Sequence, residues 1–512
     1  NDDFAEDTDE FYTRDHQYDD DGNRMARNLD SNGRFHTDWL NMIYPRLWLA
    51  RDLLSDKGII LINIDENEIT NLQKICNEVF GEVNDLGTIV WDKRNPKGEV
   101  QGIAYQHEYI LVFAKNKVTF SEKCKMQRPK KNAVVILDKA EQFFKKINLA
   151  YPFERANKDF AKWVSSQNDF TGGEKAYNSF DENGKVYRPV SMAAPDKPET
   201  RSHRPLIHPV TNKPCPIPVK GWRFPNKSMD ILLQNGEILF GADETTQPRR
   251  KYLLEENMYD NIPSLLHYGG SDTRLLANLG IPFDTPKVVE IVMEHVQAFT
   301  TDGDIILDFF SGSATTAHAV IQLNAADEGH RKFIMVQLPE ICAEDTEAAK
   351  AGYKNICEIG KERIRRAGAK IKSDSPLTTQ DFDTGFRVLK LDSTNMRDVY
   401  YTPREYTQRD LDGLIDNIKP DRTPEDLLFQ VMLDLGVPLS AKIRRGGGVF
   451  YVNDNYLIAC FEKADDALVT TIAQAKPYYA VFRDSDFASD SALVNFEQIF
   501  ATYSPTTVRR VL

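Results

Sequence analysis

The stretch DIILDFFSGSATTAHAV, residues Asp304–Val320, decides the fold of this sequence. A short apolar run ends at the acidic residue Asp308, and small residues around Gly312 lead into a helix-like segment from Thr315. A buried strand followed by a tight turn and a helix is typical of an open α/β sheet, which binds ligands at the carboxyl ends of its strands. Backbone N–H groups at the start of such a helix can hold a polar ligand. The stretch therefore predicts a cofactor loop in an α/β domain.

A second acidic residue is expected near such a loop. It should follow the next strand, where it can bind ribose hydroxyls, and the segment FIMVQLPE places Glu340 there. The loop has one glycine, whereas a dinucleotide-binding loop needs the pattern G-x-G-x-x-G, so NAD is disfavoured. On these residues alone, a plain buried strand with a tight turn and no ligand is the alternative.

The segments at the start of the chain predict further helices and strands. Residues 37–58 have helical periodicity, IILINIDENE reads as a buried strand ending in Asp65 and Glu66, and GTIVWDKRNP and EYILVFAKN read as two more strands. This order predicts a mostly parallel sheet covered on both faces. Asp65 and Glu66 could line a cleft at the sheet edge, or they could cap the helix that follows.

The character of the chain changes along its length. Residues 116–260 are rich in Pro, Lys, Arg and Asn and have few long apolar runs, which predicts a loop-rich module inserted in the sheet domain. Regular α/β character returns over residues 261–384. A further transition leads to an α+β domain over residues 385–512, where a helix should begin with Thr423 as cap and Pro424 in its first position. The predicted fold class is α/β, with an inserted module and a C-terminal α+β domain.

The composition is that of an ordinary globular protein, since 41% of the 512 residues are hydrophobic and 28% are charged. No apolar run approaches a membrane span, and the six cysteines form no C-x-x-C pair. We therefore expect no membrane partner, no structural metal and a reducing cytoplasm. The net charge of −13 hides a basic region, because residues 201–251 hold nine Lys and Arg against four acids. This region could face phosphates.

Several motifs give the sequence a family resemblance. DFFSGSATTAHAV resembles the S-adenosylmethionine-binding motif F-x-G-x-G of DNA methyltransferases that methylate amino groups, with Ala314 replacing the second glycine. GIPFDTPKVVEIV is similar to the F-x-x-P-K-P element of these enzymes, with Val288 replacing the last proline. NMIYPRLWLARDLLSDKGIILINIDENE, GYKNICEIGKERIRRAG and TPEDLLFQVMLDLG look like modification subunits of Type III restriction–modification systems. The resemblance covers essentially the whole chain.

The resemblance implies a Rossmann-like methyltransferase sheet that binds S-adenosylmethionine. The activity it implies is methyl transfer to adenine N6 in duplex DNA, without a metal. The implied cofactor-binding residues are Asp308, Phe310, Gly312, Ser313, Ala314, Thr315 and Glu340, together with Phe283, Pro286 and Lys287 of the element that closes over the cofactor.

The resemblance also implies an order of parts. In the permuted (beta) class of these enzymes the catalytic half precedes the recognition region, and the cofactor loop comes afterwards. Residues 1–115 would then be the catalytic half, 116–260 the target-recognition domain, 261–384 the cofactor-binding half and 385–512 an assembly domain. The implied partners are duplex DNA, a second copy of the chain in a homodimer, and a restriction subunit that is a helicase-like motor and nuclease. The chain has no P-loop motif, so it is not itself that motor.

The catalytic D-P-P-Y motif of the family does not occur in the sequence, and neither do N-P-P-Y and S-P-P-Y. In relatives the motif lies shortly before a stretch like NDDFAED, which is where this sequence begins. We therefore expect the motif upstream of Asn1. The first residue is also not a methionine. The motif holds the flipped target base, and we therefore name no catalytic residue. Two alternatives stay open: N4-cytosine methylation, which S-P-P-Y often accompanies, and a DNA- and cofactor-binding paralogue or fragment without activity. An oxidoreductase is disfavoured by the loop.

The basic residues of the middle module are the expected DNA-binding residues. Some should contact phosphates and a few should read base edges, and the aromatic residues Trp222 and Tyr187 lie among them. For any one of these residues, a solvated surface position is at least as good an interpretation. The candidates are Arg201, Arg204, Lys213, Lys220, Arg223, Arg249, Arg250 and Lys251.

Overall fold

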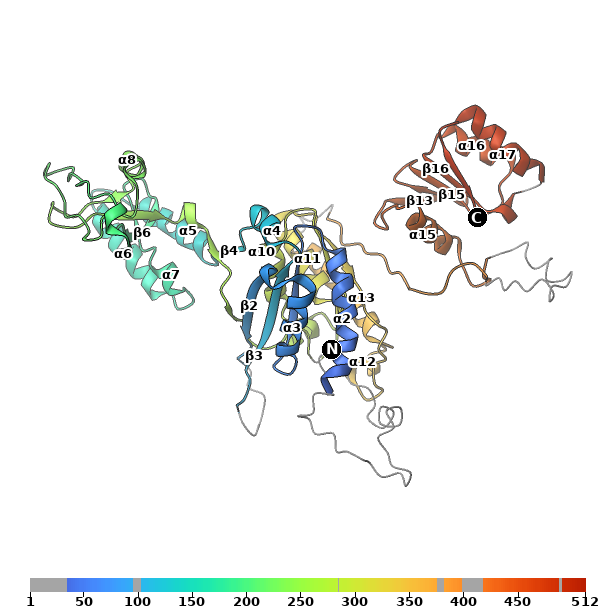
Figure 1. The fold of residues 1–512 in the computed structure, drawn as a ribbon, viewed down its shortest axis with the longest axis horizontal. Helices are drawn as coiled ribbons and strands as arrows, with labels where there is room; N and C mark the ends of the chain where they lie inside the picture. The colour runs from blue at the N-terminus through green and yellow to red at the C-terminus, as the bar shows by residue number, and fades with distance from the viewer. Residues whose placement is uncertain (1–34, 95–102, 284, 375–381, 398–417, 488–489) are drawn as a thin grey trace, which may run out of the picture. The chain divides into compact units, whose positions relative to one another are not determined.

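The computed structural model describes residues 35–94, 103–283, 285–374, 382–397, 418–487 and 490–512. The chain divides into two compact units, Asn1–Thr384 and Gly385–Leu512 (Figure 1). None of the described helices is long and apolar enough to cross a membrane.

The first unit begins with a four-stranded sheet in the order β1-β3-β2-β10. Strand β3 is antiparallel to both β1 and β2, whereas β10 is parallel to β2. The prediction of a mostly parallel sheet is therefore wrong for this half. The residues between β2 and β3 include Pro96, Gly98 and Gly102 and have no helical pattern, so they suit a hairpin-like return and not a helical crossover. The elements of this part are α2 (Phe35–Leu53), β1 (Ile59–Ile64), α3 (Ile69–Phe80), a 3₁₀ turn (Glu82–Asn84), β2 (Asp85–Asp92), β3 (His107–Ala114) and α4 (Lys117–Lys123).

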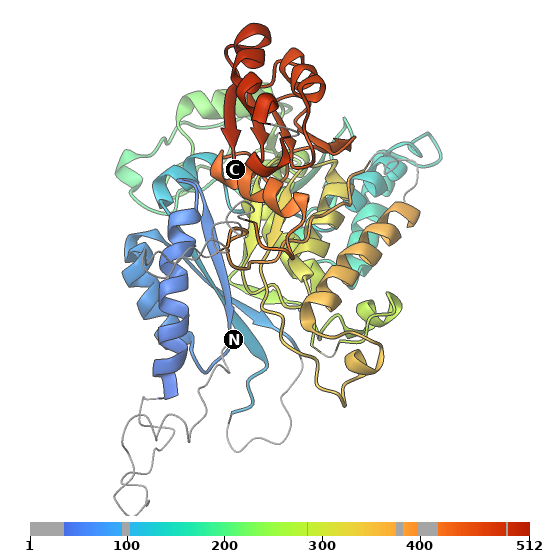
Figure 2. The ribbon, with the colours of Figure 1, turned by 90° about the vertical axis from the view of Figure 1, so that its right-hand side faces the viewer.

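Helices cover both faces of this sheet, as the sequence predicts. On one face α2 and α3 pack against the strands, with Leu72 of α3 in one apolar cluster with Phe113 (Figure 2). On the other face Ile291 of α10 packs in a cluster with the buried Trp91. The layers are therefore helix, sheet and helix, which confirms the α/β class.

The chain returns to this body after the middle module and adds a parallel pair of strands, β11 and β12. Val292 of α10 contacts both the four-stranded sheet and the core under this pair, so α10 joins the two parts. The elements are β10 (Leu265–His267), α9 (Thr273–Asn278), α10 (Val289–Phe299), β11 (Ile305–Asp308), α11 (Thr315–Asp327), β12 (Lys332–Met335), α12 (Glu347–Lys350) and α13 (Ile356–Asp374).

Strands β1 and β11 point in the same direction. Their starts lie together, because Lys57 before β1 forms an ion pair of 3.7 Å with Asp304 before β11. Their ends also lie together, because Phe309 after β11 packs on the cluster that contains Ile64, the last residue of β1. The carboxyl ends of β1, β2, β10 and β11 therefore share one edge of the body, and this edge positions the candidate site.

The middle module is more regular than the predicted loop-rich segment. Its sheet has the order β5-β6-β8-β7, and three of its helices have nine to fourteen residues. The signal for two of them was present in the sequence, because AVVILDKAEQFF and FERANKDFAKWVSS repeat apolar residues with helical spacing. The elements are β4 (Gln127–Pro129), α5 (Ala133–Phe144), α6 (Phe153–Ser166), α7 (Gly172–Lys175), β5 (Ser179–Phe180), β6 (Val186–Ser191), α8 (Asn226–Gln234), β7 (Ile238–Leu239), β8 (Arg249–Leu253) and β9 (Tyr259–Asn261), with 3₁₀ turns at Pro198–Thr200 and Glu255–Asn257.

The second unit is a five-stranded sheet in the order β13-β14-β15-β16-β17. β13 to β15 are antiparallel, but β15, β16 and β17 are parallel and connected through helices, which is closer to alternating α/β than to the predicted α+β domain. Helices α16 and α17 cover one face and α15 covers the other (Figure 1). Thr423 and Pro424 begin α15 as predicted. The elements are α15 (Pro424–Asp434), β13 (Ile443–Gly446), β14 (Val449–Val452), β15 (Leu457–Cys460), α16 (Asp466–Gln474), β16 (Tyr479–Phe482), a 3₁₀ turn (Asp484–Asp486), α17 (Asp490–Tyr503) and β17 (Val508–Val511).

Candidate functional site

Asp308 ends strand β11 at the shared edge, and its carboxylate organises the loop that follows. Oδ1 accepts a hydrogen bond from the backbone N of Phe310 at 3.2 Å. Oδ2 accepts one from the hydroxyl of Thr316, in the first turn of α11, at 2.6 Å. The acid therefore ties the strand to the helix across the loop, as the predicted cofactor loop requires.

The loop backbone makes a left-handed turn at Gly312 and Ala314, where φ is +49° and +60°. The N–H of Gly312 donates to the side-chain oxygen of Gln337 at 2.7 Å, and Ser311 N donates to Val336 O at 3.2 Å. A side chain added at Gly312 would meet no atom within 4 Å, so there is open space beside this residue. Helix α11 begins directly after Ala314. The loop thus combines room for a ligand with the amino end of a 13-residue helix.

Two of the predicted loop residues face inward. Ser313 and Thr315 are buried, and their hydroxyls accept hydrogen bonds from Nη1 of Arg363 at 2.9 and 2.8 Å. Phe310, in contrast, exposes 39% of its surface. At Ser313 and Thr315, a contact with a ligand would therefore have to come from the backbone.

Glu340 lies farther from the loop than the sequence predicts. Strand β12 ends at Met335, so Glu340 comes five residues later, on the exposed stretch that leads to α12. The residue that reaches the loop from this side is Gln337, through its bond to Gly312. The predicted strand was too long because VQL continues its apolar alternation beyond the last paired residue.

Lys287 lies in a cluster of charges at the same edge. Its Nζ is 2.5 Å from one carboxylate oxygen of Glu108, and Nζ of Lys93 is 2.5 Å from the other. Burial alone would raise the pKa of Glu108, but the two ammonium groups outweigh burial and lower it. Both lysines also lie over the ring of Trp91, at 5.2 and 5.4 Å from its centroid. Two cations share one anion here, which leaves the cluster with a positive charge.

The remaining residues of the predicted F-x-x-P-K element are anchored below the edge. Phe283 packs on the apolar cluster of α9 and α13. Pro286 is buried, and its carbonyl accepts a hydrogen bond from Asp272 N at 3.4 Å. Oδ2 of Asp272 accepts a second bond, of 2.6 Å, from Val289 N at the start of α10. Asp272 therefore fixes both ends of the short segment that carries Lys287.

Other acids at this edge have local partners. Asp65 accepts hydrogen bonds from the backbone and side chain of Asn67 at 2.9 and 2.8 Å, so it closes a turn. It does not cap the following helix α3, whose N-cap residue is Glu68. Asp92 at the end of β2 is 2.9 Å from His267 at the end of β10. The backbone N–H of Arg94 and the His267 ring lower the pKa of Asp92.

Most of the predicted DNA-binding residues are already paired within the middle module. Six of the eight candidates have a polar partner there. The pairs are Arg201 with Asp196 (3.1 Å), Arg204 with Asp230 (2.5 Å), Lys213 with Glu244 (2.8 Å), Lys220 with the carbonyl of Pro195 (2.8 Å), Arg250 with Glu237 (3.0 Å) and Lys251 with Asp181 (3.8 Å).

Arg223 and Arg249 are different. Both side chains are exposed, and within the described ranges neither forms an ion pair. Arg249 is the register partner of Ser191 at the end of β6, and the backbone N of Arg223 bonds to the carbonyl of Met192. The two arginines thus extend from backbone positions that flank the same end of one strand, and both charges are available to a partner.

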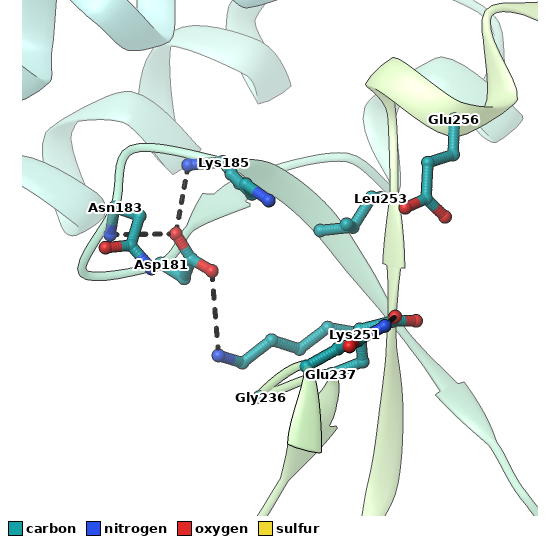
Figure 3. Close-up of a pocket in the computed structure, with 9 residues that line it drawn as sticks. Asp181, Asn183, Lys185, Gly236, Glu237, Lys251, Leu253 and Glu256 are labelled. Carbon is teal, nitrogen blue, oxygen red and sulfur yellow. Dashed lines mark hydrogen bonds and ion pairs between the residues drawn. The ribbon is translucent and has the colours of Figure 1, made fainter. Parts of the chain in front are cut away.

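A cavity of about 200 Å³ lies in the middle module, between the β5–β6 turn, strand β8 and the α8–β7 turn (Figure 3). Lys251 reaches across it to Asp181, and Lys185 is the other lysine in its wall. Glu237 and Glu256 add two more acids, so the acids outnumber the lysines. This mixed lining does not favour an anion, and the cavity contains none of the loop residues.

The sequence reading missed several residues that organise the site. Arg363, Asp272, Gln337 and Glu108 contact predicted residues from positions that are distant in the sequence, and Lys93 joins them through Glu108. The signal for Arg363 was weak, because GKERIRRAGAK contains several basic residues and only the tertiary structure shows which of them is buried.

Residues 12–348 match the family model N6_N4_Mtase, whose members are DNA methylases. The matched range is more than half of the chain and includes the loop, the Lys287 segment and the middle module. The chain belongs to this DNA methylase family.

The chain is similar to subunits of restriction–modification enzymes. It is 32% identical to the Type III restriction-modification enzyme EcoP15I Mod subunit of Escherichia coli over 76% of this chain and 60% of that protein. It is 29% identical to the StyLTI Mod subunit of Salmonella typhimurium over 74% of this chain and 51% of that protein. The methylase thus spans roughly half to three fifths of the length of these relatives.

Similarities outside the Type III proteins are weaker. The Type II methyltransferase M.KpnI of Klebsiella pneumoniae is 27% identical over 67% of this chain and 76% of its own length. The solved structure of TTHA0409 from Thermus thermophilus, complexed with S-adenosyl-L-methionine, matches 67% of this chain and 84% of its own at 12% identity, with a TM-score of 0.27. A structural likeness this distant adds nothing to the family assignment.

Proposed function

We propose that this DNA methylase is the modification and recognition subunit of a Type III restriction–modification system, and that it transfers a methyl group from S-adenosylmethionine to adenine N6 in duplex DNA. One observation carries the proposal: the Asp308 loop, with open space at Gly312, lies at the edge where the strands of a DNA methylase domain end. The similarity to the EcoP15I and StyLTI Mod subunits supports the Type III assignment.

The residues at the loop fit S-adenosylmethionine. The space beside Gly312 admits a ligand close to the backbone, the ring of Phe310 is partly exposed, and the carboxylate of Asp308 lies at the strand end. Phe283 and Lys287 belong to the segment that would close over the ligand, and Glu340 would reach it only from the exposed stretch beyond β12. When bound, the cofactor supplies a methyl group activated by a sulfonium.

The chain's own residues would act by orienting the reactants. Asp308 and Gln337 fix the loop, and the positive cluster of Lys93 and Lys287 on Glu108 favours negative charge at the same edge. Methyl transfer to an amine is a displacement that depends on positioning and on electrostatic stabilisation. We assign no residue to hold the base, because the sequence contains none of the D-P-P-Y, N-P-P-Y or S-P-P-Y motifs.

The middle module would be the target-recognition domain. Arg223 and Arg249 are the best candidates for contact with phosphates or guanine edges, since their charges have no intramolecular partner within the described ranges. Arg201, Arg204, Lys220 and Arg250 could contribute only after releasing their present partners. A restriction subunit and a second copy of the chain are the proposed protein partners, and residues 385–512 are the proposed assembly unit.

Transfer of labelled methyl from S-adenosylmethionine to duplex DNA, followed by nucleoside analysis, tests the function. We expect labelled N6-methyladenine. Labelled N4-methylcytosine would replace the adenine assignment with its alternative. Binding of both cofactor and DNA without any transfer would mean that the chain is a binding protein without activity.

A further inference from the structure

Arg363 on α13 is fully buried, with 0% of its surface exposed, although it carries a full charge. Nη1 bonds the hydroxyls of Ser313 and Thr315, and Nε lies 3.4 Å from Nδ1 of His318. One side chain therefore holds the end of the cofactor loop and the first turn of α11. Next to it, a side chain added at Gly360 would stand 3.4 Å from the carbonyl of Gly312, so α13 packs tightly under the loop.

Arg363 and Asp272 also influence each other's pKa. Burial lowers the pKa of Arg363 to about 10, and the negative charge of Asp272 opposes this shift. Burial raises the pKa of Asp272, and Arg363 in turn opposes that. Asp272 bonds Pro286 and Val289 through its backbone and its carboxylate. Asp272, and not Arg363, is therefore the residue that fixes the segment carrying Lys287.

Stability alone is a poor reason for this arrangement. A buried ion is expensive to desolvate, and well-packed apolar residues of the same volume are often at least as stabilising. A guanidinium instead provides a fixed hydrogen-bonding geometry, because its planar group of N–H donors sets the positions of the acceptors that it binds. Here these acceptors, the hydroxyls of Ser313 and Thr315, lie where the loop that the proposed function assigns to the cofactor meets α11.

We propose that Arg363 is a positioning residue for cofactor binding: it holds the 308–315 loop through Ser313 and Thr315 in the arrangement that S-adenosylmethionine requires. The inference rests on the proposed function and deepens it. Arg363 itself makes no contact with the reacting atoms.

Calorimetric titration of the full chain with S-adenosylmethionine tests the role. Arg363→Met keeps the volume and removes the donors, and it should weaken cofactor affinity by about tenfold or more, the effect of losing two charge-assisted hydrogen bonds. Arg363→Lys should recover part of the loss, because a charge and one donor return. Arg365→Met, on the exposed side of the same helix, is the matched control and should bind as the wild type does.

A second variant keeps the inference testable if Arg363→Met fails to fold. Thr315→Val has nearly the same shape but lacks the acceptor, and it should weaken cofactor affinity several-fold.

The proposed function and the role of Arg363 can fail separately. If the wild type does not bind S-adenosylmethionine, the proposed function is overturned and the inference falls with it. If the wild type binds and Thr315→Val and a folded Arg363→Met bind within twofold of it, only the inference is overturned.

Discussion

At the scale of single residues, Ala314 shows how the loop differs from its family pattern. The family resemblance places a glycine here, and the structure explains why, since φ is +60° and the left-handed region costs a non-glycine residue about 1–2 kcal/mol. Ala314 is buried and begins α11, so it cannot relax without moving the helix. The loop therefore carries local backbone strain at the candidate site.

Ala314→Gly should leave the free energy of unfolding unchanged or slightly raised, because relief of strain offsets the added freedom of the unfolded chain. The matched control is Ala317→Gly, a buried position in the interior of the same helix, which should lower the free energy of unfolding by about 1 kcal/mol or more. Urea denaturation of both variants checks this. Equal losses would contradict the assigned backbone conformation.

The two unpaired arginines give a prediction about DNA. Arg223→Ala and Arg249→Ala should each weaken binding to duplex DNA and reduce its dependence on salt by about one unit of slope, while cofactor affinity stays the same. Lys213→Ala is the control, since Lys213 is equally exposed but paired with Glu244, and its effect should be smaller. DNA affinities that match the wild type in both arginine variants would remove them from the interface.

Much of the candidate site follows from the sequence, but not the direction of its side chains. The strand, the turn and the helix around Asp308 are local features, and they lie where the residue pattern predicts. The inward orientation of Ser313 and Thr315 depends on Arg363, which is 48 or more residues away in the chain. The ion pairs of Arg204 with Asp230 and of Arg250 with Glu237 also depend on tertiary contacts. Composition alone could therefore not distinguish these paired arginines from Arg223.

At the scale of elements, α10 joins the two halves of the first unit and carries the buried His295. Burial lowers the pKa of His295 to about 4, and burial also lowers the pKa of His318 on α11 to about 4. Between pH 6.5 and 4 the unfolded chain therefore binds more protons than the folded chain. The stability that these neutral histidines provide is complete above pH 6.5 and is lost as the pH falls toward 4.

Lowering the pH from 7 to 4.5 should therefore reduce the stability of the first unit by about 2 kcal/mol for each of these histidines. His295→Leu cannot take up the proton, so it should lose less stability over this range than the wild type does. Scanning calorimetry at the two pH values measures both. An identical loss in wild type and variant would show that His295 is not the responsible group.

Strand direction was predictable only in part at this scale. β1 and β2, which are connected through α3, point in the same direction, as the helix between them indicates. β3 reverses because no helical pattern separates it from β2, and this cue was present in the sequence. The helices of the middle module were not recognised, although α6 has a clear helical pattern, with Ala156, Phe160 and Val164 four residues apart on its buried face.

At the scale of the whole molecule, the two compact units have separate cores. Phe450 and Phe482 belong to the two apolar clusters of the second unit, and both clusters consist of residues beyond position 385. A fragment of residues 385–512 should therefore unfold in one cooperative thermal transition. Phe450→Ala should lower its midpoint markedly, by the loss of a fully buried ring. Circular dichroism that shows no transition in the fragment would mean that this unit depends on the rest of the chain.

The central claim is that the Asp308 loop binds S-adenosylmethionine, and the most direct test is a titration of wild type, Asp308→Ala and the control Asp304→Ala with S-adenosylmethionine and with NADH. Asp304 lies just before the start of the same strand, far from the loop. We predict that the wild type and Asp304→Ala bind S-adenosylmethionine in preference to NADH, and that Asp308→Ala loses at least about tenfold in affinity while remaining folded. Tighter binding of NADH, or unchanged binding in Asp308→Ala, would contradict the claim.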